Sequence, residues 1–67
     1  MNRRSVSSSN VASIGWEDGT LEVEFRSGAV YRYDDVPEQD FVDLLRAPSI
    51  GRYLNGVIIP NFNGYPV

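Results

Sequence analysis

The stretch Leu21–Tyr33, LEVEFRSGAVYRY, decides the fold. Its first half alternates apolar and charged residues, the two-residue period of a strand with one buried face. In its second half, Tyr31 and Tyr33 flank Arg32, so that in a strand both rings share one face and the guanidinium lies on the other. The turn at residues 26–28 determines which face the rings take.

Two lengths of this turn are compatible with the sequence. If Ser27 and Gly28 form a two-residue loop, both tyrosines lie on the acidic face. If Arg26 joins the loop, Gly28 takes the left-handed position of a G1 bulge and both tyrosines lie on the apolar face. The opposed residues are then Val23–Tyr31, Leu21–Tyr33 and Glu22–Arg32. We favour this register, because burying an aromatic side chain stabilises a fold by roughly 1.5–3 kcal/mol, and an exposed ion pair adds only about 0–1 kcal/mol.

A second hairpin is predicted upstream. Asp18-Gly19 is a strong signal for a two-residue turn, and the residues before it alternate as those after it do. In the resulting register, the opposed residues are Trp16–Leu21, Ile14–Val23 and Ala12–Phe25. All three pairs are apolar, which supports this register. The polar residues 1–5 are predicted to be a flexible arm, and residues 6–67 a single domain.

Helices are predicted downstream. Pro37 suits a helix start, acidic residues follow it, and Pro48 ends the helix at about Ala47. Ser49 can cap a second, shorter helix that ends near Asn55-Gly56. Residues 57–59 are a candidate short strand, and the rest reads as a packed tail. The expected fold is α+β: a three-stranded antiparallel meander followed by two short helices on one face, in the order β-β-β-α-α.

The amino-acid composition limits the kinds of functional site that this chain can form. The 67 residues include no Cys and no His, so a thiolate ligand, a disulfide and a histidine general base are excluded. The acids do not match a known metal loop, and no nucleophile motif is present. We therefore expect no enzyme activity, no catalytic residue, no metal and no cofactor. The net charge of −3 argues against strong non-specific binding to a phosphate backbone. The absence of a long apolar run predicts a cytoplasmic protein without a membrane segment.

The order of several short motifs resembles the KTSC domain. The most specific are Tyr31-x-Tyr33 and the S-x-G-x-[YF]-x-N block, here Ser49, Gly51, Tyr53 and Asn55. The resemblance covers roughly residues 5 to 66. The family is named for its occurrence at the C-terminus of some lysyl-tRNA synthetases, and it also occurs alone in bacterial and phage proteins. The resemblance implies RNA as a partner, through its association with the synthetase. Family members commonly carry basic residues in the closing stretch, where this chain has the uncharged Ile59-Pro60-Asn61.

Candidate site residues follow from these patterns, and each has a structural alternative. The candidate nucleic-acid-binding residues are Tyr31, Arg32, Tyr33, Arg52, Tyr53, Arg3 and Arg4. The tyrosines either stack on exposed bases or pack beneath the helices, and the second is favoured by the register. The arginines either form a basic patch or make local ion pairs. The alternative function is a protein-interaction module, through a sheet edge or as a homodimer, without nucleic-acid contact.

Overall fold

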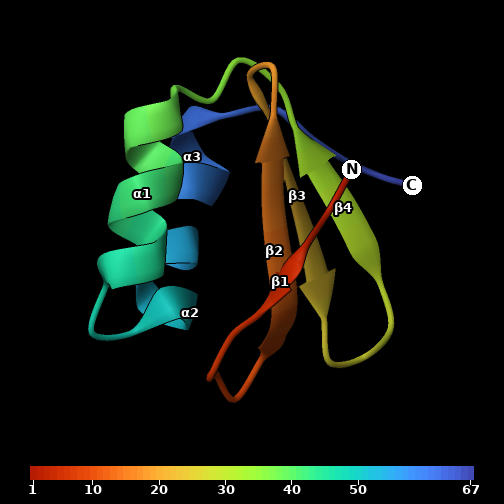
Figure 1. Cartoon of the computed structure of the whole chain (residues 1–67), viewed down its shortest axis with the longest axis vertical. Coiled ribbons are helices and arrows are strands. Elements are labelled where there is room, and N and C mark those ends of the chain that lie inside the picture. The colour runs from red at the N-terminus through yellow and green to blue at the C-terminus, as the bar shows by residue number, and fades with distance from the viewer.

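A five-stranded antiparallel sheet carries the helices on one face (Figure 1). The computed structural model describes residues 1–67. The strands are β1 (Arg4–Ser5), β2 (Val11–Glu17), β3 (Thr20–Phe25), β4 (Val30–Tyr33) and β5 (Gly64–Pro66), in the spatial order β1-β2-β3-β4-β5. The helices are α1 (Glu38–Arg46), α2 (Ile50–Tyr53), the π-helical segment η1 (Leu54–Ile58) and α3 (Ile59–Asn61).

The turn between β3 and β4 has the predicted three-residue form. Gly28 has a φ of 97°, and its N–H donates to the carbonyl of Phe25 at 2.9 Å. The N–H of Phe25 donates to the carbonyl of Ala29 at 2.8 Å. Tyr33 consequently lies opposite Leu21, with Tyr31 two residues back on the same face. The favoured register is confirmed.

The β2–β3 hairpin is confirmed near its turn and differs at its far end. Asp18 and Gly19 both have positive φ, as a type I′ turn requires. Beyond Ser13 the register shifts through a β-bulge, so that Val11 lies opposite Phe25. The predicted pairing of Ala12 with Phe25 is therefore wrong. The bulge turns the larger Val11 side chain inward, where it is fully buried.

The sheet has five strands, and the prediction of three was wrong. Two residues of the predicted arm form β1, with Arg4 opposite Ile14. The predicted tail forms β5, with Tyr65 opposite Arg32. Strands of two and three residues are too short to show an alternating pattern, which explains why the sequence did not reveal them.

The second helical segment is longer than predicted. Ser49 caps α2 as expected, its hydroxyl accepting the N–H of Arg52 at 3.3 Å. The helical backbone then continues through η1 and α3, so the predicted end at Asn55-Gly56 and the candidate strand at residues 57–59 are both wrong. Leu54 and Ile58 explain the continuation, because both are buried only if the chain stays helical between them.

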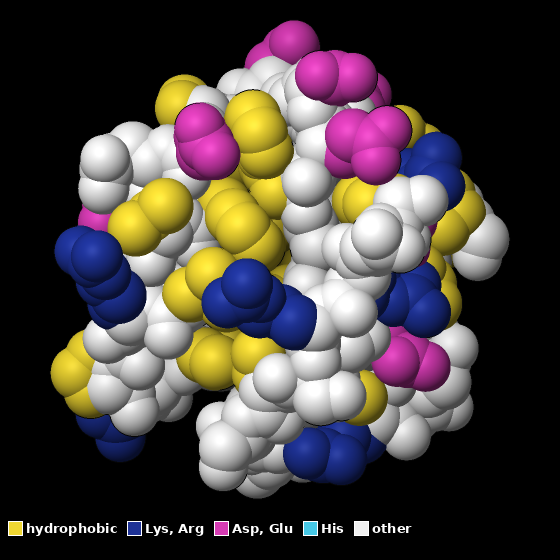
Figure 2. Space-filling model, in the orientation of Figure 1, with side chains coloured by type: hydrophobic (Ala, Val, Ile, Leu, Met, Phe, Trp, Pro, Cys, Tyr) yellow, Lys and Arg dark blue, Asp and Glu magenta, His cyan; other side chains and the backbone are white.

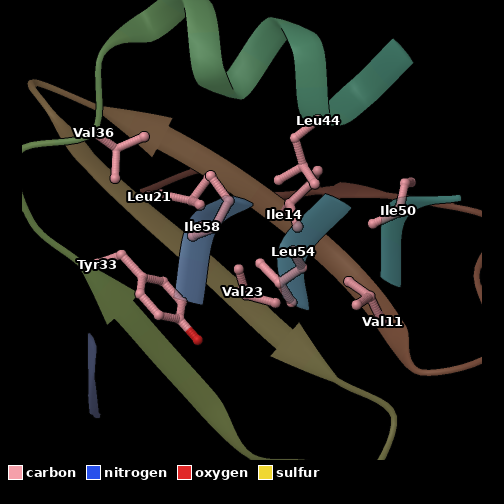
Figure 3. Packing of buried hydrophobic residues seen from close by; sticks show 10 residues of the cluster. All are labelled: Val11, Ile14, Leu21, Val23, Tyr33, Val36, Leu44, Ile50, Leu54 and Ile58. Carbon is pink, nitrogen blue, oxygen red and sulfur yellow. The ribbon is translucent and has the colours of Figure 1, made fainter. Parts of the chain in front are cut away.

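The core lies between the sheet and the helices, and Figure 3 shows its packing. Ten buried residues form it: Val11, Ile14, Leu21, Val23, Tyr33, Val36, Leu44, Ile50, Leu54 and Ile58. Two hydrogen bonds hold the loop before α1 against the hairpin. Trp16 Nε1 donates to the carbonyl of Val36 at 2.7 Å, and the N–H of Val36 donates to the carbonyl of Gly19 at 2.8 Å.

Candidate functional site

The outer face of the sheet, away from the helices, is occupied by an ion-pair network. Arg32 Nε donates to Glu22 Oε1 at 2.7 Å, and Arg3 Nη1 donates to Glu22 Oε2 at 2.7 Å. The hydrogen bond from Arg32 holds the pKa of Glu22 below its usual value of 4.5; Arg3 acts in the same direction and burial opposes both. Two of the candidate arginines are thus already neutralised by a carboxylate of the same chain.

The N-terminal arm covers this network. A Cβ added at Gly15 would collide with the backbone carbonyl oxygen of Asn2, so the arm runs directly over that glycine. From there the side chain of Arg3 reaches Glu22, which is only 5% exposed. Figure 1 shows the N-terminal end of the chain passing across the sheet. The outer face is therefore not the open surface that base stacking would need.

The two central tyrosines lie on the helix-covered face. Tyr33 is 5% exposed, and burial raises the pKa of its phenol above the usual 10.0. Tyr31 is half-buried and meets Phe25 edge-on, with ring centroids 6.0 Å apart. A Cβ on Gly64 would overlap the ring of Tyr33, so the start of β5 lies flat against that ring. Both tyrosines contribute to the packed side of the sheet, as the register predicted.

Both tyrosines also line a depression on that side. We call it the aromatic groove: a volume of about 450 Å³ lined by Phe25, Tyr31, Tyr33, Ile59, Phe62, Asn63 and Gly64. A second depression, the polar pocket, measures about 300 Å³ and is lined by Asn10, Val11, Phe25, Arg26, Ser27, Gly51, Leu54 and Asn55. Phe25 lines both, so its side chain stands between the two. Together they follow the junction between the β3–β4 hairpin and the second helical segment.

The tyrosine hydroxyls divide into two classes. Tyr53 donates to Asp40 at 3.4 Å, and Tyr65 donates to Asp34 at 3.0 Å. The hydroxyls of Tyr31 and Tyr33 make no hydrogen bond within the chain, although both residues line the aromatic groove. No fully enclosed side-chain nitrogen or oxygen lacks a partner, so these two hydroxyls are reachable from outside. Unbonded polar groups in a largely apolar depression are suited to orienting a ligand.

Charge is segregated between the two ends of β3. We call one the acidic end, formed by the β2–β3 turn, the β4–α1 loop and the start of α1; it carries Glu17, Asp18, Asp34, Asp35 and Glu38. The bond between Val36 and Gly19 holds these segments together. The other, the arginine end, carries Arg26 in the β3–β4 turn, Arg46 in the last turn of α1 and Arg52 in α2. Two acids of α1, Asp40 and Asp43, lie close to Tyr53 on this side. On the face drawn in Figure 2, most of the visible acidic side chains lie at the top of the molecule.

The structure separates the candidate arginines from one another. Arg3 is held at the outer face, whereas Arg52 lies in α2, in the helical layer on the opposite side of the sheet. Arg4 is exposed in β1 and makes no ion pair. Arg52 and Tyr53 border a third depression of about 350 Å³ beside Pro48. The predicted patch of arm residues with Arg52 therefore does not include Arg3.

The sequence did not indicate that Arg26, Arg46 and the depressions lie in one region of the molecule. Arg26 makes no ion pair; its Nε donates to the carbonyl of Ser8 at 2.8 Å. Asn55 of the S-x-G-x-[YF]-x-N block was the available signal, since it lines the polar pocket next to Arg26. The chain forms no group of three or more potential metal-ligating residues. None of its helices has the length and apolar character needed to cross a membrane.

A family model and a solved structure both identify one family. The model of the KTSC domain matches residues 7–62. An uncharacterised protein from Stutzerimonas stutzeri is 45% identical over 67 residues, covering 97% of this chain and 94% of the relative. A protein from Tsukamurella paurometabola is 41% identical over 59 residues, covering 85% and 88%. The crystal structure of the KTSC domain protein YPO2434 from Yersinia pestis superposes with a TM-score of 0.94 at 38% identity, covering 98% of this chain and 96% of that one.

Proposed function

This chain belongs to the KTSC domain family, and on that premise we propose that it is a non-enzymatic module that binds single-stranded RNA through its arginine end. The observation that carries the proposal is the segregation of charge. The three arginines at this end make no ion pair, and those on the outer face are paired with Glu22. Although the net charge is −3, three arginines without an ion pair are thus available at one end of the molecule.

The physical basis is local electrostatics. Arginine donates to phosphate with a planar, bidentate guanidinium. At physiological salt, charges more than about 8 Å apart in solvent are largely screened, so acids at the far end of the molecule do little to repel a strand bound at the arginine end. The depressions beside Arg26 and Arg52 give that end a shaped surface.

A salt titration tests the proposal. A labelled ten-nucleotide single-stranded RNA is titrated at several salt concentrations between 20 and 150 mM. We expect saturable binding that weakens as salt rises, with a logarithmic slope of about −0.7 for each phosphate contact. Failure to bind at 20 mM salt would rule the proposal out.

Matched substitutions locate the surface. Arg26→Gln and Arg52→Gln should each lower the affinity and reduce the salt slope by about 0.7, the value for one phosphate contact. Arg4→Gln is the control, because it removes the same charge from an exposed, unpaired arginine in β1. Equal losses for all three variants would point to net charge alone and against a defined arginine end.

A protein-interaction role is the second candidate, favoured by the edge strand β5. Its three residues are all exposed, only one side of it is paired, and Val67 beyond it is 61% exposed. Such an edge can pair with a strand from another chain. This candidate predicts a dimer or a captured peptide strand. A strictly monomeric mass by light scattering, with no added strand bound, would contradict it.

A further inference from the structure

We propose that the polar pocket and the aromatic groove together bind one unstacked nucleotide of the RNA, with its phosphate beside Arg26 and its base beside Tyr31 and Tyr33. This inference rests on the proposed function and adds the site that a base would occupy. The occupant follows from the chemistry of two depressions that share Phe25: a polar pocket with an arginine and a mainly apolar, aromatic groove. A nucleotide has two matching parts, an anionic phosphate joined to a flat base.

The polar pocket offers hydrogen-bond donors that the chain does not use. Arg26 makes one side-chain hydrogen bond, through Nε to the carbonyl of Ser8, which leaves both terminal nitrogens for a ligand. The side-chain amides of Asn10 and Asn55 make no hydrogen bond within the chain and line the same pocket. Guanidinium and amide donors around one pocket suit a phosphate and its ribose.

The aromatic groove offers faces and edges for a base. Phe25 lies between the two depressions, and Phe62 lines the aromatic groove from the end of the second helical segment. Bases stack on aromatic side chains with little dependence on sequence. The polar groups that would bind the base edge are the hydroxyls of Tyr31 and Tyr33, which have no partner in the chain. A phenol hydroxyl both donates and accepts, so it can pair with a base edge of either type.

The size and shape of the two depressions favour a single nucleotide that has left its stack. Volumes of about 300 and 450 Å³ lie within or near the range of roughly 300–1,000 Å³ typical of small-ligand pockets. A base paired within a duplex cannot enter such a depression, because its faces are covered by neighbouring bases. Proteins that read RNA sequence generally bind unpaired loops and single strands for this reason.

The experiment compares two strands that differ only in their bases. A six-nucleotide RNA and an abasic strand with the same sugar-phosphate backbone are titrated into the full chain, and amide chemical shifts are recorded. We expect the strand with bases to bind at least about tenfold more tightly, the scale of one lost stacking contact. The additional shifts should fall at Phe25, Tyr31, Tyr33 and Phe62.

The outcomes separate this inference from the proposed function. Equal affinity for the two strands, with shifts confined to the arginine end, would overturn the base site and leave RNA binding intact. No binding of either strand would overturn both. Shifts in the groove upon addition of a short apolar peptide, with none upon addition of either strand, would show that the groove binds protein and would also overturn the inference.

Paired substitutions of tyrosine provide a second readout. Tyr31→Phe and Tyr33→Phe each keep the ring and remove only a hydroxyl that no residue of the chain uses. We expect each to lower affinity for the strand with bases several-fold and to leave affinity for the abasic strand unchanged. Tyr65→Phe is the control, because its hydroxyl binds Asp34 and it does not line the groove. Unchanged affinity in both groove variants, with melting temperatures like that of the unmodified chain, would contradict the assigned role of the hydroxyls.

Discussion

Glu22 shows how much of this fold depends on single side chains. Its carboxylate binds a different arginine with each oxygen, Arg3 from the arm and Arg32 from β4. It therefore connects two segments that are far apart in the sequence. The cross-strand pair with Arg32 was predictable from the strand period, since both residues fall on the same face in the favoured register. The second partner was not predictable, because an arginine in a polar arm carries no signal of where the arm lies.

Glu22→Gln tests the importance of this carboxylate. At pH 7 the variant should melt about 4–8 °C lower, the shift that a loss of about 1 kcal/mol causes in a domain of this size. The pKa of Glu22 is lowered in the folded state, so the ionised group stabilises the fold above pH 4.5, and this contribution is lost as the pH falls below that value. Thermal melts at pH 7 and pH 3 should therefore show a large difference between the two proteins at pH 7 and a small one at pH 3. An equal difference at both would contradict this role.

Tyr33 is the second residue with a clear expected effect. Tyr33→Ala should cost roughly 3–5 kcal/mol, as truncation of a large buried aromatic side chain does. Folded domains are stable by roughly 0.05–0.15 kcal/mol per residue, about 3–10 kcal/mol for 67 residues, so the variant should lose much of its stability and melt far below the unmodified chain. Circular dichroism measures this directly. Tyr65→Ala, at a site that is 36% exposed, should be folded under the same conditions.

At the scale of elements, periodic segments were predictable and short or irregular ones were not. The β2–β3 and β3–β4 hairpins and α1 each contain several apolar residues at a regular spacing, and each was predicted with nearly its observed bounds. The bulge before Ser13 was missed, because Val11 and Ala12 are both apolar and either could face inward. η1 was not predicted, because Asn55-Gly56 is a favourable helix end by local preference. The chain stays helical beyond these residues because this buries Ile58.

The N-terminal arm gives a prediction at this scale. Gly15→Ala should dislodge the arm from the outer face, because the new methyl group would occupy the position of the Asn2 carbonyl. The loss should be confined to β1 and to the contact of Arg3 with Glu22. Hydrogen exchange should show faster exchange at residues 4–6, with the core little changed. Gly56→Ala is the matched control: outside its own helical turn no atom lies within 4 Å of the added group, and a helical site should accept alanine without loss of stability.

At the scale of the whole molecule, the groove and the arginine end are products of the tertiary fold. The walls of the aromatic groove come from β3, β4 and the residues after η1, which are about thirty positions apart in the sequence. The resemblance singled out Tyr31, Tyr33 and Asn55 by residue, but no pattern indicated that the first two line one depression and the third its neighbour. The segregation of charge likewise depends on which turns meet at the same end of β3.

The distance between the two charged ends leads to a further prediction. The molecule measures 25 × 24 × 21 Å, which exceeds the screening length of about 8 Å at physiological salt but not that of about 30 Å at 10 mM. Glu17→Gln combined with Glu38→Gln should therefore raise RNA affinity several-fold at 10 mM salt and less than about twofold at 150 mM. Binding curves for both proteins at the two salt concentrations test this. A gain that does not depend on salt would show that the acidic end touches the strand.

The π-helical segment has a consequence for how the groove can change. The N–H of Ile59 donates to the carbonyl of Leu54, five residues back, so this turn holds one residue more than an α-helical turn. Removing one residue between Leu54 and Ile58 would restore α-helical spacing, because the N–H of Ile59 would still reach the carbonyl of Leu54, now four residues back. Ile59 and Phe62 would keep nearly the same direction and stay in the groove. The loss of a single codon at this point would therefore be absorbed within one turn, and the helical wall of the groove would keep its side chains.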